Sequence, residues 1–427
     1  METLPLFTKK NDLSEVSRML DLLGHPEDGF RLIHVAGTNG KGSTCAFLEA
    51  IFRQAGFKTG LFTSPHLIRI NERIRVQNRE IPDDAFAEAL AKVLQVQKVH
   101  MQTGGKRLTW FETLFVLSLC YFEKSGIDLL VCETGLGGRL DATNTIRKAD
   151  GVVITSVSLD HTQYLGDTVE KIAWEKAGII RLGAPVIYCA KDPRSARVIA
   201  EAAHEKHAEP IGLTPDLYTV TERKHASLQV GLTKKDGNRL SLQVPFAAEY
   251  QAENACLAAL CALRLGAKEE TIRSGIAHTE WPGRMQEIRP DVYVDGAHNP
   301  DAALRLNSEI RRIGRNGRVW LLTAIVSDKN HSEIVRSLCS GIDFAGVVVT
   351  SVGGDRQLGA QVLAEEFRAA GLKRIEIEPD VEKAYQLALR EKKDNPLICT
   401  GSLYLAGEIL AMEKRLRSGL PHLGSAG

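Results

Sequence analysis

Short runs of apolar residues alternate along much of the chain with segments whose apolar residues recur at helical spacing. A run at 32–36 predicts a strand, and the helix predicted behind it begins at Ser43 and ends at Gly56. Further apolar runs predict buried strands at 127–132, 152–157 and 185–189. Because near-continuous apolar strands separated by helices are buried on both faces, the pattern predicts a mostly parallel sheet covered by helices.

Capping and turn signals locate further elements. Thr109 and Glu112 have the spacing of a capping box, which predicts a helix that begins there and ends at Gly126. The pattern of apolar residues then changes and predicts three short strands, at 217–222, 227–233 and 239–244. An Asp-Gly pair at 236–237 predicts a hairpin turn between the last two, and an alanine-rich helix is predicted over 251–265.

Regular periodicity breaks over 281–290 and resumes behind it. Alternating strands and helices follow, with strands predicted near 292–294, 319–323, 345–350, 374–378 and 396–400. The fold class is therefore predicted as α/β. A P-loop-type, mostly parallel ATPase domain with a small β-hairpin region is expected over 1–285, and a second, smaller Rossmann-like α/β domain over 291–427.

Composition excludes several classes of protein. The chain has 427 residues, 44% of them hydrophobic and 25% charged, as in an ordinary globular protein of two or three domains. Its 54 basic and 53 acidic residues give a net charge of +1, so no global field favours nucleic acid or an anionic membrane as a partner. No apolar run is long enough to span a bilayer, no secretory signal begins the sequence, and the eight cysteines form no CxxC pair. We expect a cytoplasmic enzyme.

The sharpest chemical signal lies between the first predicted strand and its helix. It is a glycine-rich segment consisting of Gly37, Thr38, Asn39, Gly40, Lys41, Gly42 and Ser43. Glycines let successive backbone N–H groups point at one anion, the helix N-terminus adds positive partial charge, and Lys41 adds a full charge. His34 stands where a Walker motif has its first glycine, so the match is not strict. We interpret the segment as a nucleotide phosphate loop; a plain strand–helix turn is the alternative.

With its surroundings, this loop resembles the folylpolyglutamate synthase/dihydrofolate synthase family of the Mur-ligase group. The resemblance rests on HVAGTNGKGS at 34–43, TSPHL at 63–67, NERI at 71–74, GLGGRLDATN at 135–144, LDHT at 159–162, EKAGII at 175–180, DGAHNP at 295–300 and GSLYL at 401–405. One such motif would be weak, but the set runs in order along nearly the whole chain.

The resemblance implies an ATP-dependent ligase. The carboxylate of dihydropteroate or a reduced folate would take the γ-phosphoryl group of ATP, and the amine of L-glutamate would attack the resulting acyl phosphate. Phosphoryl transfer of this kind requires charge neutralisation, so Mg²⁺ is expected. The matching family residues imply Ser64, Glu133 and His161 as its ligands. By chemistry alone, His161 is equally well a hydrogen-bonded loop histidine, and Glu133 a solvated strand end.

Lys176 is predicted at the C-terminal end of a helix, where a lysine ordinarily complements the helix dipole. In the resembled family the matching lysine can be carbamylated, and the new carboxylate supports a second magnesium ion. We hypothesise the same catalytic role for Lys176.

Three residues match those that line the pterin pocket of family members able to use dihydropteroate: Phe111, Arg139 and Asp141. An aromatic face can stack on a pterin, and a carboxylate can accept from its N–H donors. For Phe111 the alternative is ordinary packing in the first turn of its helix. The Arg-Leu-Asp-Ala pattern favours the dihydropteroate reaction, and a tail-extending enzyme without it is the alternative.

The remaining matches concern the nucleotide and the amino acid. Asn254 and Arg284 match residues that contact the ATP base and phosphates, and Asp295 and His298 match residues that close over the nucleotide and the incoming glutamate. Lys329 follows a predicted strand end and is a candidate for a carboxylate of the amino acid. For Arg284 and Lys329 the alternative is a solvated surface charge.

Rival functions fit less well. A peptidoglycan Mur ligase usually carries an additional N-terminal domain, and 36 residues before Gly37 leave no room for one. A GTPase is expected to show Asn-Lys-x-Asp, which does not occur, and a nucleic-acid ATPase to show a basic stripe. We therefore expect small-molecule partners (ATP, L-glutamate and dihydropteroate or a reduced folate) and, by analogy with the family, a monomer.

Overall fold

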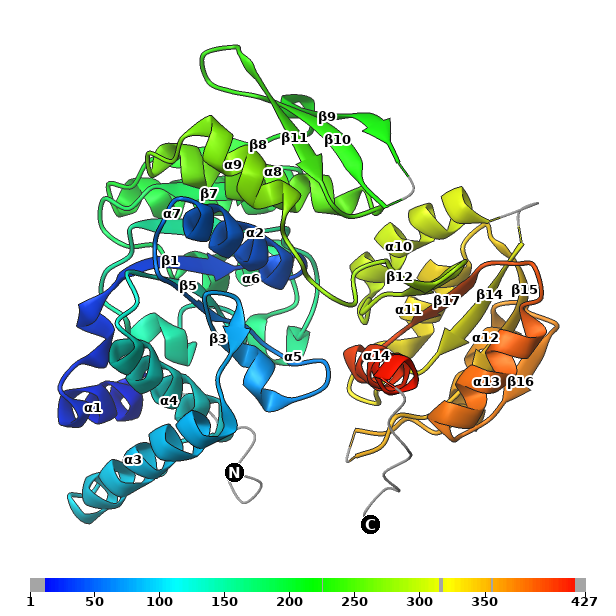
Figure 1. The fold of residues 1–427 in the computed structure, drawn as a ribbon, viewed down its shortest axis with the longest axis horizontal. Helices are drawn as coiled ribbons and strands as arrows, with labels where there is room; N and C mark the ends of the chain where they lie inside the picture. Colours follow the sequence, from blue (N-terminus) through cyan, green and yellow to red (C-terminus); the bar gives the residue numbers. More distant parts are fainter. Residues whose placement is uncertain (1–11, 225, 315–317, 355, 419–427) are drawn as a thin grey trace. The chain divides into compact units, whose positions relative to one another are not determined.

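The computed structural model describes residues 12–224, 226–314, 318–354 and 356–418. These residues form two compact units (Figure 1). The first unit contains the described residues up to Pro65 together with Ile70–Pro245 and Tyr250–Glu280. The second contains the short segments His66–Arg69 and Phe246–Glu249 and the described residues from Trp281 onward.

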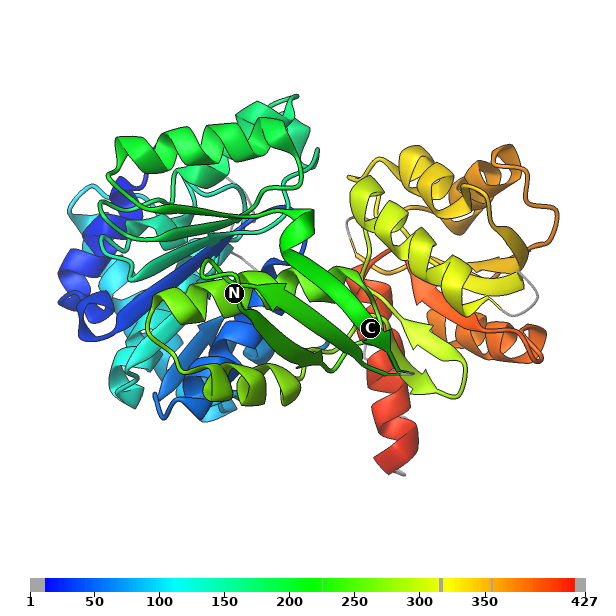
Figure 2. The same cartoon turned by 90° about the horizontal axis from the view of Figure 1, so that it is seen from above.

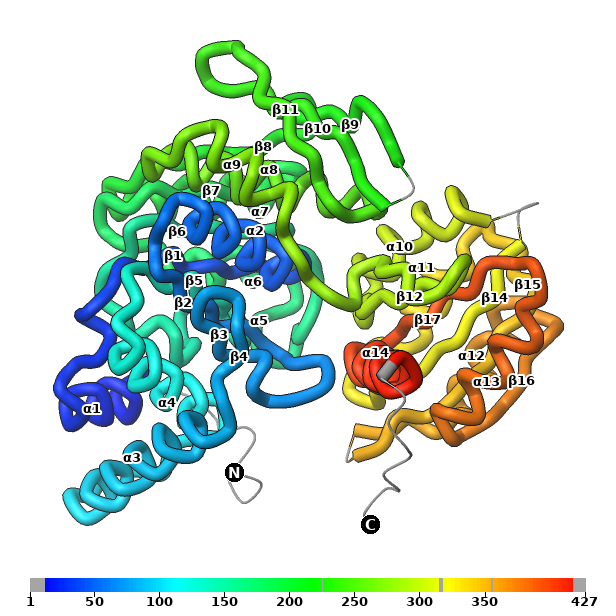
Figure 3. Tube along the Cα trace, viewed as in Figure 1, coloured from blue at the N-terminus to red at the C-terminus, as the bar shows by residue number. Residues whose placement is uncertain are grey.

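An eight-stranded sheet forms the centre of the first unit, in the order β4-β3-β2-β5-β1-β6-β7-β8. The strands from β2 to β8 in this order are parallel, which confirms the predicted sheet type, and β3 and β4 add an antiparallel edge that Figure 3 traces. The bounds are β1 (Arg31–Ala36), β2 (Thr59–Phe62), β3 (Ile74–Val76), β4 (Arg79–Glu80), β5 (Leu129–Glu133), β6 (Gly151–Ile154), β7 (Val186–Cys189) and β8 (Pro210–Leu213).

Helices cover both faces of this sheet (Figure 2). One face packs against α2 (Lys41–Gln54) and α8 (Tyr250–Arg264), and α9 (Glu269–Ala277) packs on these two helices. The other packs against α4 (Trp110–Ser125), α6 (Val169–Ala177) and α7 (Pro193–Glu205), and the unpredicted α1 (Ser14–Leu23) and α3 (Asp83–Gln102) pack outside α4. The shorter helices are α5 (Thr162–Leu165), η1 (Pro26–Gly29), η2 (Ile70–Arg73), η3 (Ala142–Thr145) and η4 (Pro215–Leu217).

Local signals in the sequence set several helix ends. The capping box of α4 is present, with Glu112 N donating to Thr109 Oγ1 and Thr109 N donating to Glu112 Oε2. Gly126 ends that helix at φ +60°, a left-handed conformation that glycine adopts without strain. Helix α2 begins at Lys41, two residues before the predicted Ser43, so Lys41 and Gly42 belong to its first turn.

A separate three-stranded antiparallel sheet follows in the order β11-β10-β9, and its strands are the three that the apolar pattern predicted. Its strands are β9 (Tyr218–Arg223), β10 (Leu228–Thr233) and β11 (Arg239–Val244). The predicted hairpin joins β10 to β11, with Gly237 at φ +79° and Asp236 Oδ1 accepting from Asn238 N.

The second unit is built on a six-stranded sheet in the order β12-β13-β17-β14-β15-β16. All neighbours are parallel except β12 and β13. The strands are β12 (Gln286–Arg289), β13 (Val292–Val294), β14 (Arg318–Thr323), β15 (Asp343–Val349), β16 (Ile375–Ile377) and β17 (Leu397–Thr400). The five predicted strands are confirmed; the polar edge strand β12 was not predicted.

Within the described residues of this unit, five helices flank the sheet. They are α10 (Pro300–Ile313), α11 (His331–Cys339) and α12 (Ala360–Ala369) on one face, and α13 (Val381–Glu391) and α14 (Leu403–Ser418) on the other. The predicted cap at the start of α14 is present, since Tyr404 N donates to Ser402 Oγ at 3.0 Å. Among the described residues, no helix has both the length and the apolar character needed to cross a bilayer.

Candidate active site at the carboxyl ends of the strands

The loop between β1 and α2 has the geometry of a phosphate cradle. Gly37 and Gly40 have φ angles of +151° and +89°, which disfavour any residue with a side chain. A Cβ atom on Gly37 would lie 1.8 Å from Thr155 Oγ1, and one on Gly40 would lie 2.2 Å from Asn254 Oδ1. Backbone shape and surrounding atoms therefore both require glycine at these positions.

The chain that follows β6 holds the loop in shape. Thr38 N donates to Ser156 O at 2.7 Å, and Thr155 Oγ1 donates to Asn39 O at 2.7 Å. The side chain of Thr38 also bonds the backbone of Ser158, whose N–H lies 3.1 Å from Thr38 Oγ1. The loop conformation is thus set by contacts between segments more than a hundred residues apart.

Lys41 turns back over this loop. Its Nζ lies 3.2 Å from Thr38 O, to which it donates, and 3.8 Å from Glu133 Oε1 at the end of β5. Glu133 is buried, and its Oε2 accepts from Ser64 N at 3.0 Å. Because the carboxyl ends of neighbouring parallel strands meet at one edge of the sheet, three predicted site residues from distant parts of the sequence lie together.

The oxygen atoms here suit magnesium, which prefers carboxylate, hydroxyl and water ligands. Glu133 supplies a carboxylate, and Ser64, two residues beyond the end of β2, supplies a hydroxyl. His161 precedes α5 at φ +51°, and its N–H donates to Asp160 Oδ1 at 2.9 Å. No group of three or more His, Cys, Asp or Glu side chains in the described part of the chain could hold a metal ion. One carboxylate and one hydroxyl fit an ion that takes its other ligands from phosphate and water.

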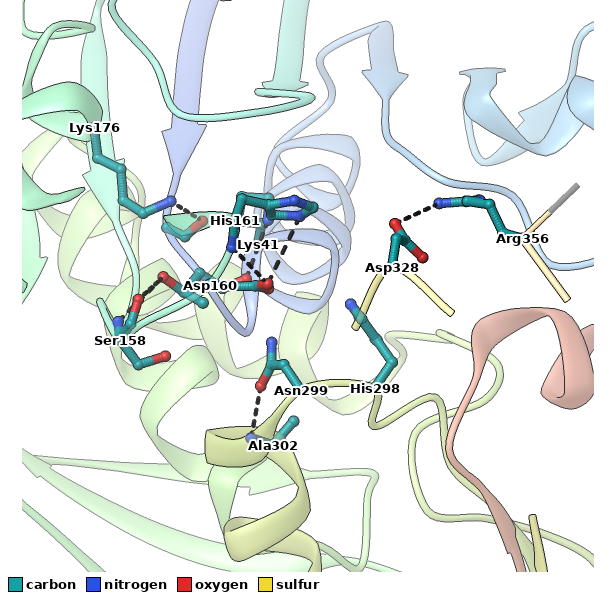
Figure 4. A network of polar contacts seen from close by, with 12 residues as sticks. Lys41, Ser158, Asp160, His161, Lys176, His298, Asn299, Ala302, Asp328 and Arg356 are labelled. Carbon is teal, nitrogen blue, oxygen red and sulfur yellow. Dashed lines mark hydrogen bonds and ion pairs between the residues drawn. The ribbon is translucent and has the colours of Figure 1, made fainter. Parts of the chain in front are cut away.

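Lys176 lies at the predicted helix end but points inward (Figure 4). It is buried, and its Nζ donates to Gly37 O at 2.7 Å. Burial, and after it the nearby charge of Lys41, lowers the pKa of Lys176 to about 7 against the opposing effect of Asp160 and Asp141. A solvated lysine that only complements the helix dipole would show neither feature.

Asn254 also lies beside the phosphate loop. Its Nδ2 donates to Gln251 Oε1 at 2.9 Å, and Gln251 Nε2 donates in turn to Ser43 Oγ at 3.2 Å. Through these bonds, α8 supports the start of α2. The contact of Asn254 with the ATP base remains a prediction.

The three predicted substrate residues lie in one part of the first unit. Phe111 packs in the first turn of α4 against the hydrophobic core and lies 5.9 Å from the Phe62 ring. Asp141 is buried, and it accepts from Leu136 N at 2.8 Å and from Thr143 Oγ1 at 2.7 Å. Arg139 forms an ion pair with Glu175. Each residue therefore has a structural contact in addition to any role toward a substrate.

His34 is a buried residue near this region for which the sequence analysis predicted no role. Its Nε2 lies 2.8 Å from Thr143 Oγ1. Since the Thr143 hydroxyl donates to Asp141, His34 must donate through Nε2, which leaves Nδ1 as an acceptor without a partner. Complete burial lowers the pKa of His34 to about 3, so the ring is neutral. A histidine inside an apolar strand was the only signal for it in the sequence.

The second unit carries the remaining predicted residues. Asp295 directly follows β13 and accepts two backbone hydrogen bonds at 2.8 Å, from Met285 N and Ala297 N. Arg284 Nη1 donates to Gly283 O at 3.1 Å, and His298 Nδ1 donates to Gly296 O at 2.8 Å. These contacts fix the turn at the carboxyl end of β13.

Lys329 lies in the turn after β14, where Lys329 N donates to Val326 O at 3.2 Å. The neighbouring Asp328 forms an ion pair with Arg356 at 3.4 Å, drawn in Figure 4, and Arg356 lies over the Tyr404 ring. The sequence analysis assigned no role to Arg356, which nevertheless lies at the same edge of the sheet as Asp328.

Comparisons with known proteins agree with this architecture. The pattern of the Mur ligase middle domain matches residues 35–262, and that of the Mur ligase glutamate ligase domain matches residues 283–403. The chain is 35% identical to the dihydrofolate synthase/folylpolyglutamate synthase of Escherichia coli, with 98% of this chain and 95% of that protein covered. It is 32% identical to the protein of the same name in Bacillus subtilis, with 96% of each chain covered.

Solved structures give the same result. E. coli FolC in complex with DHPP and ADP superposes with a TM-score of 0.84 at 32% identity, covering 97% of this chain and 96% of that one. Mycobacterium tuberculosis folylpolyglutamate synthase complexed with ADP gives a TM-score of 0.86 at 29% identity, covering 94% of each chain. The chain therefore belongs to the dihydrofolate synthase/folylpolyglutamate synthase family of the Mur ligases.

Proposed function

We propose that this protein is a bifunctional dihydrofolate and folylpolyglutamate synthase that joins L-glutamate to dihydropteroate or a reduced folate at the expense of ATP. A substrate carboxylate oxygen attacks the γ-phosphorus, the bond to the β-phosphate oxygen breaks, and ADP leaves. The glutamate amine then attacks the acyl carbon and loses a proton, and phosphate leaves as the C–O bond breaks. The observation that carries this proposal is the meeting of Lys41, Glu133 and Lys176 at the phosphate loop in a chain of this family.

Each residue of this group has a distinct task. The loop N–H groups from Gly37 to Ser43 and the start of α2 bind the phosphates, and Lys41 neutralises charge that develops on the transferring group. Ser64, Glu133 and His161 would hold Mg²⁺. When bound, the ion would supply further neutralisation of the negative charge on the phosphates.

Lys176 would serve as a carbamylated lysine that supports a second magnesium ion. About half of a buried amine with a pKa of about 7 is uncharged at neutral pH, and only the uncharged amine reacts with CO₂. Replacing a buried cation by an anion would suit a site that contains Mg²⁺ and lies next to Lys41.

The other predicted residues would bind the three substrates. Phe111, Arg139 and Asp141 would contact the pterin end of the substrate, and Asn254 and Arg284 the nucleotide. Asp295, His298 and Lys329 would act on the nucleotide and the incoming glutamate. In this proposal residues 1–285 form the ATP domain and residues 291–427 the glutamate ligase domain, and the enzyme acts as a monomer.

A monofunctional folylpolyglutamate synthase is the alternative. The relative named folylpolyglutamate synthase in Lacticaseibacillus casei is 31% identical to this chain, so overall similarity does not separate the two activities. The test is ADP release with ATP, Mg²⁺ and L-glutamate, comparing dihydropteroate with a reduced folate monoglutamate. Turnover of both substrates is expected. Turnover of the reduced folate alone would establish the alternative, and turnover of neither would refute the proposed function.

A further inference from the structure

Arg139 is held on two sides by neighbouring residues of α6. Its Nη2 and Nε donate to Glu175 Oε1 at 2.8 and 3.3 Å, so one edge of the guanidinium is occupied. Its carbon Cζ lies 4.7 Å from the centre of the Trp174 ring, so one face is covered as well. The indole is 53% exposed, a high fraction for a large aromatic side chain.

The backbone around Arg139 is fixed too. Arg139 N donates to Glu175 O at 2.8 Å, and Asn144 Nδ2 bridges Arg139 O and Gly178 O at 3.0 and 3.1 Å. A Cβ atom on Gly178 would lie 2.4 Å from Arg139 Cβ, so the loop and the helix end are in direct contact. Main chain and side chain of Arg139 are therefore both positioned before any substrate arrives.

Neutralisation by Glu175 restricts what the free part of Arg139 can bind. An arginine already paired with a carboxylate attracts a second carboxylate weakly, since the pair has no net charge. Its remaining Nη1 edge still offers N–H donors in a planar fork. Such an edge suits an uncharged planar ring with carbonyl and ring-nitrogen acceptors.

We propose that Trp174 and Glu175 are positioning residues that hold the free edge of Arg139 toward the uncharged pteridine ring of the substrate. The inference deepens the proposed function and depends on it. In this proposal Arg139 binds the pteridine ring and not the glutamate tail, and the exposed Trp174 has the function of positioning Arg139.

The experiment measures KM for dihydropteroate, reduced folate monoglutamate and ATP in the full-length enzyme. Trp174→Leu is compared with Trp174→Phe, which keeps an aromatic face, and with Leu182→Ala, an equally simple change at a side chain that is 76% exposed. Loss of a cation–π contact at an exposed site corresponds to about a twofold to fivefold weakening. We expect Trp174→Leu to raise KM for both pteridine substrates by about that factor with KM for ATP unchanged, and the two other variants to stay near wild type.

A double-mutant cycle distinguishes positioning from general destabilisation. In an Arg139→Met background, Trp174→Leu should have no further effect on KM, because the side chain that it positions is gone. Glu175→Gln leaves a charged Arg139 and should improve KM for a folate diglutamate relative to dihydropteroate.

Each outcome decides between the two proposals. An inactive wild-type enzyme would overturn both the proposed function and this inference. An active enzyme in which Trp174→Leu changes no KM, changes KM for ATP equally, or acts unchanged in the Arg139→Met background would overturn only the role of Trp174 and Glu175.

Discussion

The Nζ atom of Lys176 donates a hydrogen bond to the carbonyl oxygen of Gly37 at a distance of 2.7 Å. This bond joins the last turn of α6 to the first residue of the phosphate loop, 139 positions earlier in the chain. The same helical turn holds Arg139 through Glu175. One turn of helix is therefore in contact with both the nucleotide loop and a candidate substrate residue, and several predictions can be made from it and its neighbours.

The burial of Lys176 predicts a pH dependence of stability. Its pKa is about 7 in the folded protein and near the ordinary lysine value of 10.5 in the unfolded chain. Between these values the unfolded chain binds more protons, so this residue makes the free energy of unfolding rise with pH from about 7 to 10.5. Urea unfolding in EDTA across this range should show a steeper rise for wild type than for Lys176→Met. Parallel curves for the two proteins would contradict the lowered pKa.

Carbamylation of Lys176 predicts a dependence on bicarbonate. Turnover of the wild-type enzyme should rise as bicarbonate is added to a degassed preparation, whereas Lys176→Met should be slow at every concentration. ¹³C NMR with labelled bicarbonate should show a carbamate signal in the wild type that is absent from the variant. Full turnover by Lys176→Met at any bicarbonate level would exclude the hypothesis.

Lys41→Ala should impair catalysis far more than folding. Removing one preorganised positive group from a phosphoryl-transfer site typically lowers turnover by about 10²- to 10³-fold. The effect on the free energy of unfolding should stay within ~1 kcal/mol, because the side chain forms only loop contacts and a 3.8 Å ion pair. ADP release and urea unfolding measure the two quantities, with Lys235→Ala, 97% exposed, as the control. Normal kinetics in a folded Lys41→Ala protein would refute the assignment.

Gly40→Ala should lower the affinity for ADP, because an added Cβ atom would distort the phosphate loop. Gly24, at φ +82° with nothing within 4 Å of an added Cβ, is the matched control for Gly40 at φ +89°. Both alanine variants should lose about 1–2 kcal/mol of stability from left-handed strain. Only Gly40→Ala adds a clash with Asn254, so only its ADP affinity, measured by calorimetry, should fall. Equal ADP affinities would show that the loop tolerates a side chain there.

Glu133→Gln should weaken the binding of magnesium by the enzyme. The amide keeps an oxygen that can accept from Ser64 N, but it removes the charge that an ion would bind. We expect the Mg²⁺ concentration for half-maximal ADP release to rise at least about tenfold. Glu88→Gln, whose carboxylate is 64% exposed and paired with Lys124, serves as the control. The same Mg²⁺ dependence in both variants would remove Glu133 from the metal site.

Much of this architecture could be predicted from local sequence. The glycine positions of the loop, the Thr109–Glu112 capping box and the hairpin at Gly237 each follow from the conformational preferences of single residues. Edge strands were harder to predict, because Gln286–Arg289 is polar and has no strand periodicity of its own. Pairing with β13, and not its own sequence, makes it a strand.

Of the candidate site, the sequence by itself determined the chemistry: a cation, a carboxylate, a hydroxyl and glycines in a pattern that one family shares. Tertiary structure alone decided that Lys41 faces Glu133, that Lys176 is buried against Gly37, and that His34 supports Asp141 through Thr143. The reason is physical. Conformational preference is a property of neighbouring residues, whereas burial, electrostatics and hydrogen bonding between distant segments exist only once the parallel strands bring their carboxyl ends to one edge.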